Sequence, residues 1–241
     1  MEKSFLKLFF TAILGGIIGA WFLFTINSVI FGANISGTID PKTEVLVNTS
    51  TLVPDPELWE KIVTKTSPSL VGIQTISNDR VIRQGGGIII SSDGLIVTTT
   101  DLWGPKESVY QIFYDDKIVK GELVDLDPKI RLLLLKTAVL NSSIAELNSA
   151  NYKSGQEILV IGKTLNLSKP ITVSQKGIIS QATDTSVLVD TIPNQYLFGF
   201  GASDKDGRLR GMVYLKNGAV NLIKTEIIEN FFKTYLEKIY K

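Results

Sequence analysis

The sequence of 241 residues contains no histidine and no cysteine. Without histidine there is no imidazole base, so neither Ser-His-Asp nor Cys-His catalysis is available, and no metal can be held by imidazole. Without cysteine there is no disulfide, thiolate nucleophile, zinc–thiolate site or iron–sulfur cluster. These two absences exclude the commonest hydrolytic and metal chemistries, and we expect neither a metal nor a cofactor.

An excess of charge of either sign is also lacking. The chain has 25 Lys and Arg against 24 Asp and Glu, for a net charge of +1. Nucleic-acid-binding domains normally carry a marked basic excess, so we expect no nucleic-acid partner. Apolar residues, by contrast, are abundant at 44%, and the length suffices for one large domain or two small ones.

Part of the apolar excess lies near the N-terminus. Residues 8–26 contain no charged side chain, and about 20 apolar residues are enough to cross a bilayer as a helix. Lys3 and Lys7 precede this run, whereas the next charged residue is Asp40. The positive-inside rule therefore predicts a single-pass protein of the cell membrane, with a cytoplasmic N-terminus and an extracytoplasmic C-terminal domain.

A cleaved signal peptide is the alternative to this anchor. Its apolar region would span about 7–15 residues and end at a site of small residues. The run here is longer, and Phe31-Gly32-Ala33-Asn34 is a poor cleavage site, which favours an uncleaved signal-anchor. We therefore divide the chain into an anchor (1–32), a linker rich in Ser, Thr, Asn, Gly and Pro (33–56) and a folded domain (57–241).

The folded domain shows many short β-rich runs between two helical segments. Residues 57–63 have helical spacing, Pro68 ends that segment, and residues 225–240 form an amphipathic pattern. The expected strands fall into two groups: 70–76, 87–91, 95–99, 109–114, 117–124 and 132–136, then 158–161, 171–181, 186–190, 209–215 and 219–223. This arrangement predicts an all-β domain built as paired barrels or a sandwich.

Several segments follow one another in a recognisable order. Residues 86–98 read GGIIISSDGLIVT, residues 125–136 read DLDPKIRLLLLK, and residues 173–180 read VSQKGIIS. Together with residues 63–71, 154–162 and 220–232, they resemble the HtrA/Deg family of trypsin-like serine proteases. The resemblance covers about residues 58–235 and implies two six-stranded antiparallel β-barrels with a site in the cleft between them. Because the chain ends at Lys241, the PDZ domain that usually follows in this family is not expected.

The resemblance also marks three positions that should carry catalysis. Asp101 stands where the family has its histidine, Arg131 where it has its aspartate, and Phe198 where it has its nucleophilic serine. A carboxylate is a weak base for a serine hydroxyl at neutral pH, and a phenyl ring has no nucleophilic atom. The turn that supplies the oxyanion donors in the family is here Tyr196-Leu197-Phe198, which is too bulky to assume the same geometry. We therefore expect no catalytic residue.

Two pairings of these or neighbouring residues remain open. Since the positions of Asp101 and Arg131 are adjacent in the family fold, the two side chains either form an ion pair or are unrelated surface charges. If the alignment of the nucleophile loop slips, Ser203 becomes a nucleophile with Lys205 as its base. Such a base needs a desolvated lysine, whereas residues 204–207 have the composition of an exposed turn.

The sequence thus predicts a membrane-anchored, extracytoplasmic, trypsin-like pseudoprotease of HtrA/Deg type. We expect it to bind a polypeptide, either an exposed or unfolded chain segment or an active protease partner, and its membrane contact to be the N-terminal helix. Homo-oligomerisation is compatible with this interpretation. An active serine-type endopeptidase with a rearranged site and a structural subunit of an envelope assembly are the alternatives.

Overall fold

The computed structural model describes residues 56–138, 143–149, 151–166 and 169–240. All described residues lie in one compact unit, Val53–Lys241. The predicted anchor and nearly all of the predicted linker fall outside the described residues. Among the residues that are described, no helix is long and apolar enough to cross a membrane.

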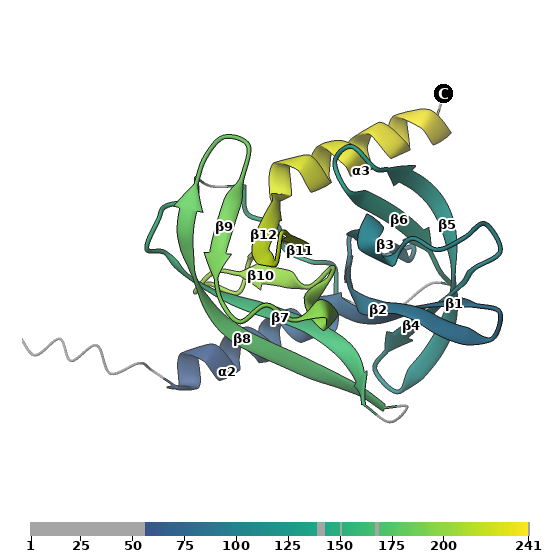
Figure 1. Cartoon of the computed structure of the whole chain (residues 1–241), viewed down its shortest axis with the longest axis horizontal. Coiled ribbons are helices and arrows are strands. Elements are labelled where there is room, and N and C mark those ends of the chain that lie inside the picture. The colour runs from purple at the N-terminus through teal and green to yellow at the C-terminus, as the bar shows by residue number, and fades with distance from the viewer. Residues whose placement is uncertain (1–55, 139–142, 150, 167–168, 241) are drawn as a thin grey trace, which may run out of the picture. The chain divides into compact units, whose positions relative to one another are not determined.

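Six antiparallel strands close into a first barrel, in the order β1-β2-β3-β6-β5-β4 (Figure 1). They are β1 (Leu70–Ser77), β2 (Arg80–Ile89), β3 (Leu95–Thr99), β4 (Val109–Tyr114), β5 (Lys117–Asp127) and β6 (Leu132–Lys136). Two-residue turns join β1 to β2 and β4 to β5, and Asp115 adopts a positive φ of 49° in the β4–β5 turn. Asp tolerates this conformation better than most residues, so the sequence Asp115-Asp116 suits the hairpin.

A second set of six antiparallel strands closes in the order β10-β11-β12-β9-β8-β7. They are β7 (Glu157–Asn166), β8 (Lys169–Ala182), β9 (Val187–Asp190), β10 (Gly201–Ser203), β11 (Leu209–Lys216) and β12 (Ala219–Lys224). Asn217 and Gly218 have φ values of 53° and 76° in the β11–β12 turn, the conformation that an Asn-Gly hairpin favours. The expectation of two six-stranded antiparallel barrels is therefore confirmed.

One hydrophobic cluster is shared by the two barrels. It unites buried side chains of β1, β2, β3 and β6 with side chains of β7, β11 and β12 and of the C-terminal helix. Leu70, Leu132 and Leu134 represent the first barrel in this cluster, and Ile161 and Met212 represent the second. Each barrel has a further core of its own. Because the apolar contact surface continues from one barrel into the other, their relative orientation is determined by packing.

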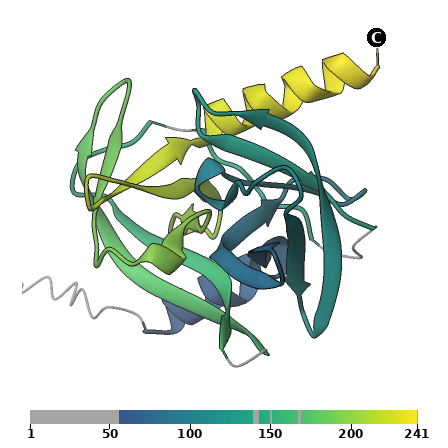
Figure 2. The ribbon, with the colours of Figure 1, turned by 45° about the vertical axis from the view of Figure 1, so that its right-hand side comes forward.

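Two helices flank the barrels. α2 (Pro56–Thr66) lies along the second barrel, while α3 (Thr225–Ile239) leaves β12 and runs beside β5 and β6 of the first barrel (Figures 1 and 2). Near the end of α3, Lys238 Nζ forms an ion pair with Asp125 Oδ2 of β5 at 2.7 Å. Both predicted helices are thus present, and α3 connects the second barrel to the first.

Two strand segments differ from the sequence-based expectation. β2 begins at Arg80, seven residues before the expected start, and β10 was not expected at all. Arg80 to Gly86 lacked a clear alternation of apolar and polar residues, and three glycines weaken strand propensity. Both segments are held by pairing with other strands, and β2 also lines the groove described next.

Candidate functional site

A groove of about 360 Å³ lies where the family resemblance places catalysis. Its lining comes from the first half of β2, from the short helix η2 (Thr100–Leu102) of the first barrel, and from the short helix η3 (Gln195–Leu197) of the second. The lining residues are Val81, Ile82, Arg83, Gln84, Asp101, Gln195, Tyr196 and Phe198. The cleft is therefore open, and two of the three predicted positions, Asp101 and Phe198, line it together.

Asp101 and Arg131 form the ion pair that the sequence left open. Nη1 of Arg131 lies 3.9 Å from Oδ1 of Asp101, and the two segments are also joined by a backbone hydrogen bond from Thr100 N to Arg131 O at 3.0 Å. The guanidinium of Arg131 also lies over the ring of Tyr214, 5.1 Å from its centroid. A cation placed between a carboxylate and an aromatic face gains from both contacts, so Arg131 links η2 to β11.

Neither carboxylate oxygen of Asp101 accepts a hydrogen bond from a hydroxyl among the described residues. Its Oδ1 faces Arg131, and its Oδ2 is buried and has no hydrogen-bond partner among the described residues. A general base must lie within hydrogen-bond reach of the proton that it removes, and the buried Oδ2 has no such partner among the described residues. Arg131 itself is not among the residues lining the groove.

Phe198 is bound to the first barrel by both its backbone and its ring. Its carbonyl accepts a hydrogen bond of 2.7 Å from Gly86 N, and its half-buried ring packs on the apolar cluster that contains Leu102. A Cβ added at Gly85 would lie 2.4 Å from the Phe198 carbonyl oxygen. The absence of a side chain at Gly85 of β2 therefore provides room for this loop.

The turn before Phe198 also differs from an oxyanion-binding turn. Asn194 caps η3, and its Oδ1 accepts a hydrogen bond of 3.0 Å from Tyr196 N. Leu197 N donates to the carbonyl of Asn194 at 3.0 Å. An oxyanion hole requires backbone N–H groups that are free and aimed at the reacting oxygen. Two successive N–H groups of this loop are instead bound within the loop itself.

The alternative dyad of Ser203 and Lys205 is not assembled. The Ser203 side chain is fully buried, and its Oγ donates to the carbonyls of Asp204 and Arg208 at 3.2 and 3.4 Å. Lys205 Nζ pairs instead with Oε2 of Glu157 at 2.8 Å. A nucleophile needs a base within hydrogen-bond reach, and here each member of the pair contacts other groups.

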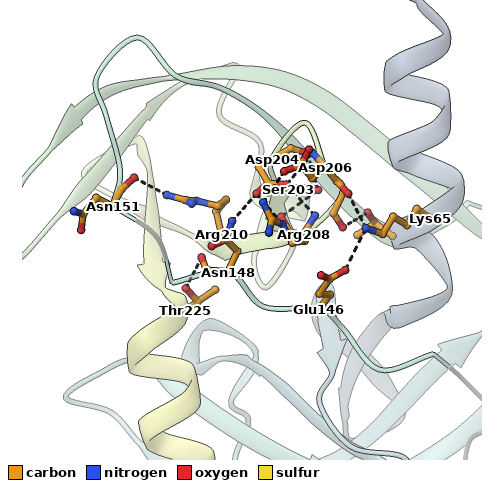
Figure 3. Close-up of polar contacts among 12 residues, drawn as sticks. Lys65, Glu146, Asn148, Asn151, Ser203, Asp204, Asp206, Arg208, Arg210 and Thr225 are labelled. Atoms are coloured by element: carbon orange, nitrogen blue, oxygen red, sulfur yellow. Dashed lines mark hydrogen bonds and ion pairs between the residues drawn. The ribbon is translucent and has the colours of Figure 1, made fainter.

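Residues 203–208 form a turn whose polar groups contact one another and neighbouring segments (Figure 3). The carboxylate of Asp204 accepts hydrogen bonds from Arg208 N and from Asn148 Nδ2, at 3.0 and 2.8 Å. Lys65 of α2 reaches the same turn by donating to the carbonyl of Asp206 at 2.7 Å. Asp204 and Gly207 are buried, so the expectation of an exposed turn was wrong at those two residues and is confirmed at Lys205 and Asp206. The bonds from Lys65 and Thr66 hold the turn against α2.

Sequence reasoning missed several residues of the groove. Val81, Ile82 and Arg83 belong to the part of β2 that was not expected to be a strand. The contact of Tyr214, in the expected strand 209–215, with Arg131 was not anticipated either. Residues 80–83 read Arg-Val-Ile-Arg, which does not alternate between apolar and polar residues and so does not predict a strand. Among the described residues, no cluster of three or more acidic, His or Cys side chains could hold a metal.

The double barrel with a groove at its junction, lined by the positions expected for catalysis, defines a trypsin-like peptidase domain. The family model described as "Trypsin-like peptidase domain" matches residues 85–218. The chain therefore belongs to the trypsin-like peptidase family, and its relatives make it an HtrA/Deg-like member.

Three curated relatives illustrate this relationship. A probable periplasmic serine endoprotease, DegP-like, of Pseudomonas putida (strain GB-1) is 29% identical over 147 residues, which is 59% of this chain and 29% of that protein. The magnetosome formation protease MamE of Paramagnetospirillum magneticum is 30% identical over 148 residues, 59% of this chain and 20% of that protein. The serine endoprotease DegS of Haemophilus influenzae is 26% identical over 211 residues, 83% of this chain and 61% of that protein.

A solved structure resembles the fold. The crystal structure of the serine endoprotease from Yersinia pestis superposes with a TM-score of 0.66 at 24% identity, and the match covers 74% of this chain and 66% of that one. At this identity the likeness supports the fold alone. The chain spans between about a fifth and three fifths of the length of the curated relatives named above.

Proposed function

We propose that this protein is a membrane-anchored, extracytoplasmic pseudoprotease that binds a polypeptide in its groove without cleaving it. The bound polypeptide would be an exposed segment of an unfolded protein or of a protease partner in the cell envelope. The printed names of the DegP-like and DegS relatives describe serine endoproteases, so a polypeptide is the kind of ligand that the family relationship favours.

The observation that carries this proposal is the occupancy of the three catalytic positions. Asp101 is paired with Arg131, and Phe198 is packed on the first barrel. The sequence has no histidine that could serve from another position. With the Tyr196 N–H bound to Asn194, the nucleophile, the base and one oxyanion donor are all missing from the groove.

An unpaired strand edge supports binding by strand addition. β2 pairs with β1 from Arg80 to Ile88, but its pairs with β3 are limited to Ile88 and Ile89. Between Arg80 and Gly85, the edge that faces away from β1 is paired with no described strand. An extended peptide can satisfy the backbone groups of such an edge, while its side chains contact the groove lining.

The membrane anchor is supported by the sequence. The uncharged run at residues 8–26 is long enough to span a bilayer, and the lysines before it favour a cytoplasmic N-terminus. Protease added to the outside of intact spheroplasts should therefore digest the C-terminal domain and spare an N-terminal tag. Protection of the C-terminal domain would contradict the proposed topology.

Reaction with a fluorophosphonate probe tests the absence of catalysis. The full-length chain, solubilised in a non-ionic detergent, should show no covalent labelling under conditions that label trypsin to completion. Heat-denatured protein serves as the control for nonspecific labelling. Covalent labelling of any serine in the folded chain above that control would overturn the pseudoprotease assignment and favour an active endopeptidase with a rearranged site.

A further inference from the structure

The groove carries a charge that its own residues do not neutralise. Resting on the function proposed above, we propose that it selects an extended polypeptide segment with an acidic side chain between apolar ones, and that Arg83 binds the carboxylate. The argument depends on the geometry of Arg83, on the pairing of Asp101, and on the apolar lining contributed by β2 and η3.

Arg83 is anchored in the groove by a single contact. It is exposed on β2, and its Nη1 donates to the backbone carbonyl of Asp101 at 2.9 Å. A guanidinium has five N–H donors in one plane. Apart from the bond to the Asp101 carbonyl, the guanidinium of Arg83 forms no hydrogen bond or ion pair with a described residue. The contact with the Asp101 carbonyl therefore anchors the guanidinium at the groove, with donors left for a ligand. This fork matches the two oxygens of a carboxylate.

The only acidic residue that lines the groove does not cancel this charge. Oδ1 of Asp101 faces Arg131, and its Oδ2 is buried. Arg131, which does not line the groove, thus neutralises the negative charge of Asp101. The positive charge of Arg83 is therefore the one that a ligand in the groove meets. A lysine or arginine at the same place in a ligand would be repelled, so the electrostatics favour an anionic side chain.

Apolar residues line the same groove as Arg83. The side chains of Val81, Ile82 and Tyr196 line the same groove and are 51%, 44% and 45% exposed. In an extended segment bound along the β2 edge, successive side chains alternate between the groove lining and solvent. Apolar residues next to the acidic residue of the ligand would therefore cover the exposed side chains of Val81, Ile82 and Tyr196 while Arg83 binds the carboxylate.

Binding of three blocked decapeptides to the full-length chain tests the proposal. The peptides are identical apart from a central Val-Glu-Val, Val-Gln-Val or Val-Lys-Val, and a fourth carries Val-Gln-Val with a free C-terminal carboxylate. We expect the Glu peptide to bind about tenfold more tightly than the Gln peptide, the order of a charge-assisted hydrogen bond, and the Lys peptide to bind most weakly.

Two variants assign the preference to Arg83. Arg83→Gln should abolish the difference in Kd between the Glu and Gln peptides, whereas Arg80→Gln should retain it. Each variant removes one positive charge, so the net charge changes equally. Arg80 is exposed on the same strand but does not line the groove, so it controls for the change in net charge. Equal melting temperatures of the two variants would show that the comparison is made between folded proteins.

The outcomes separate this proposal from the function on which it rests. If no peptide binds the wild-type chain, the proposed function fails. If the Glu and Gln peptides bind with equal Kd, or if both variants lose the preference alike, polypeptide binding stands and the role of Arg83 is overturned. Equally tight binding of the Gln peptide with a free carboxylate would overturn the assignment to an internal acidic side chain.

Discussion

Arg131 occupies a position with unusual backbone geometry. Its φ of 63° lies in the left-handed region, which an L-residue adopts at a cost of about 1–2 kcal/mol. The side chain is held by the carboxylate of Asp101 at 3.9 Å and by the ring of Tyr214. With 40% of the Arg131 side chain exposed, the ion pair contributes little to the free energy of unfolding. At Arg131 the backbone conformation therefore lowers the stability of the fold, whereas the side-chain contacts raise it.

We predict that Arg131→Gly is more stable than Arg131→Ala by about 1 kcal/mol, because both variants remove the same side-chain contacts and only glycine tolerates the positive φ. Urea denaturation of the two variants measures this difference. A variant Arg131→Ala as stable as Arg131→Gly would show that the left-handed conformation is not retained in solution.

Lys163 illustrates the cost of burying a charge between the barrels. It lies on β7 with only 8% of its side chain exposed, and its Nζ is 3.5 Å from Oδ1 of Asp115 in the β4–β5 turn. Burial lowers the pKa of Lys163 below its usual value of 10.5, and the attraction of Asp115 opposes this shift only in part. Between the lowered pKa and 10.5, the unfolded chain binds a proton that the folded chain lacks.

The stability contribution of Lys163 should therefore rise with pH across the alkaline window that ends at 10.5. We predict that the free energy of unfolding of Lys163→Met, taken relative to wild type, falls as pH rises through this window. Burial raises the pKa of Tyr110 and Tyr152, which lowers stability above pH 10, but both tyrosines are present in both proteins and cancel in the difference. A difference independent of pH would contradict the prediction.

At the scale of elements, the loop that contains Phe198 and Gly199 packs closely on β2. Gly199 has a φ of 75°, and a Cβ added to it would lie 2.1 Å from the carbonyl oxygen of Gly86. Its N–H donates to the Val213 carbonyl at 2.9 Å, so the residue is held from both barrels. The close approach of the two backbones therefore fixes the position of this loop beside β2, where Phe198 lines the groove.

We predict that Gly199→Ala lowers the free energy of unfolding by about 3 kcal/mol or more, because conformational strain and overpacking add. Gly218→Ala is the matched control, since Gly218 has a φ of 76° and open space around its Cβ position. It should cost about 1 kcal/mol from the backbone alone. Equal losses in the two variants, measured by urea denaturation, would mean that the loop does not pack on β2 as described.

At the scale of the whole domain, the two barrels share a core. The cluster that contains Leu70 and Met212 also includes Phe231 of α3, so neither barrel can unfold without exposing surface of the other. We predict a single cooperative transition for both barrels. Trp59 in α2 contacts Lys176 of β8 at 4.4 Å from its ring centroid, and Trp103 follows η2 in the first barrel, so each reports on a different barrel.

Two variants that each retain one of these tryptophans, with the other tryptophans replaced by phenylalanine, should show fluorescence transitions with the same urea midpoint. Phe231→Ala, which empties part of the shared cluster, should lower both midpoints together by the equivalent of about 3–5 kcal/mol. Two separate midpoints in the parent variants would contradict a shared core.

The sequence by itself determined the class of the fold and the absence of a histidine-based triad. β3, β4 and β6 begin and end where the apolar runs predicted them, because turn residues and alternation are local signals. The absence of histidine and the identities of Asp101, Arg131 and Phe198 follow from the sequence and the family resemblance, and they exclude a triad whatever the geometry.

Only the tertiary structure decided what those residues do instead. The Asp101–Arg131 pair, the packing of Phe198 against glycines of β2 and the position of Arg83 in the groove join residues that lie far apart in the chain. The start of β2 at Arg80 and the short β10 likewise depend on partners in other strands. Contacts of this kind arise when barrels close and pack, so no local pattern encodes them.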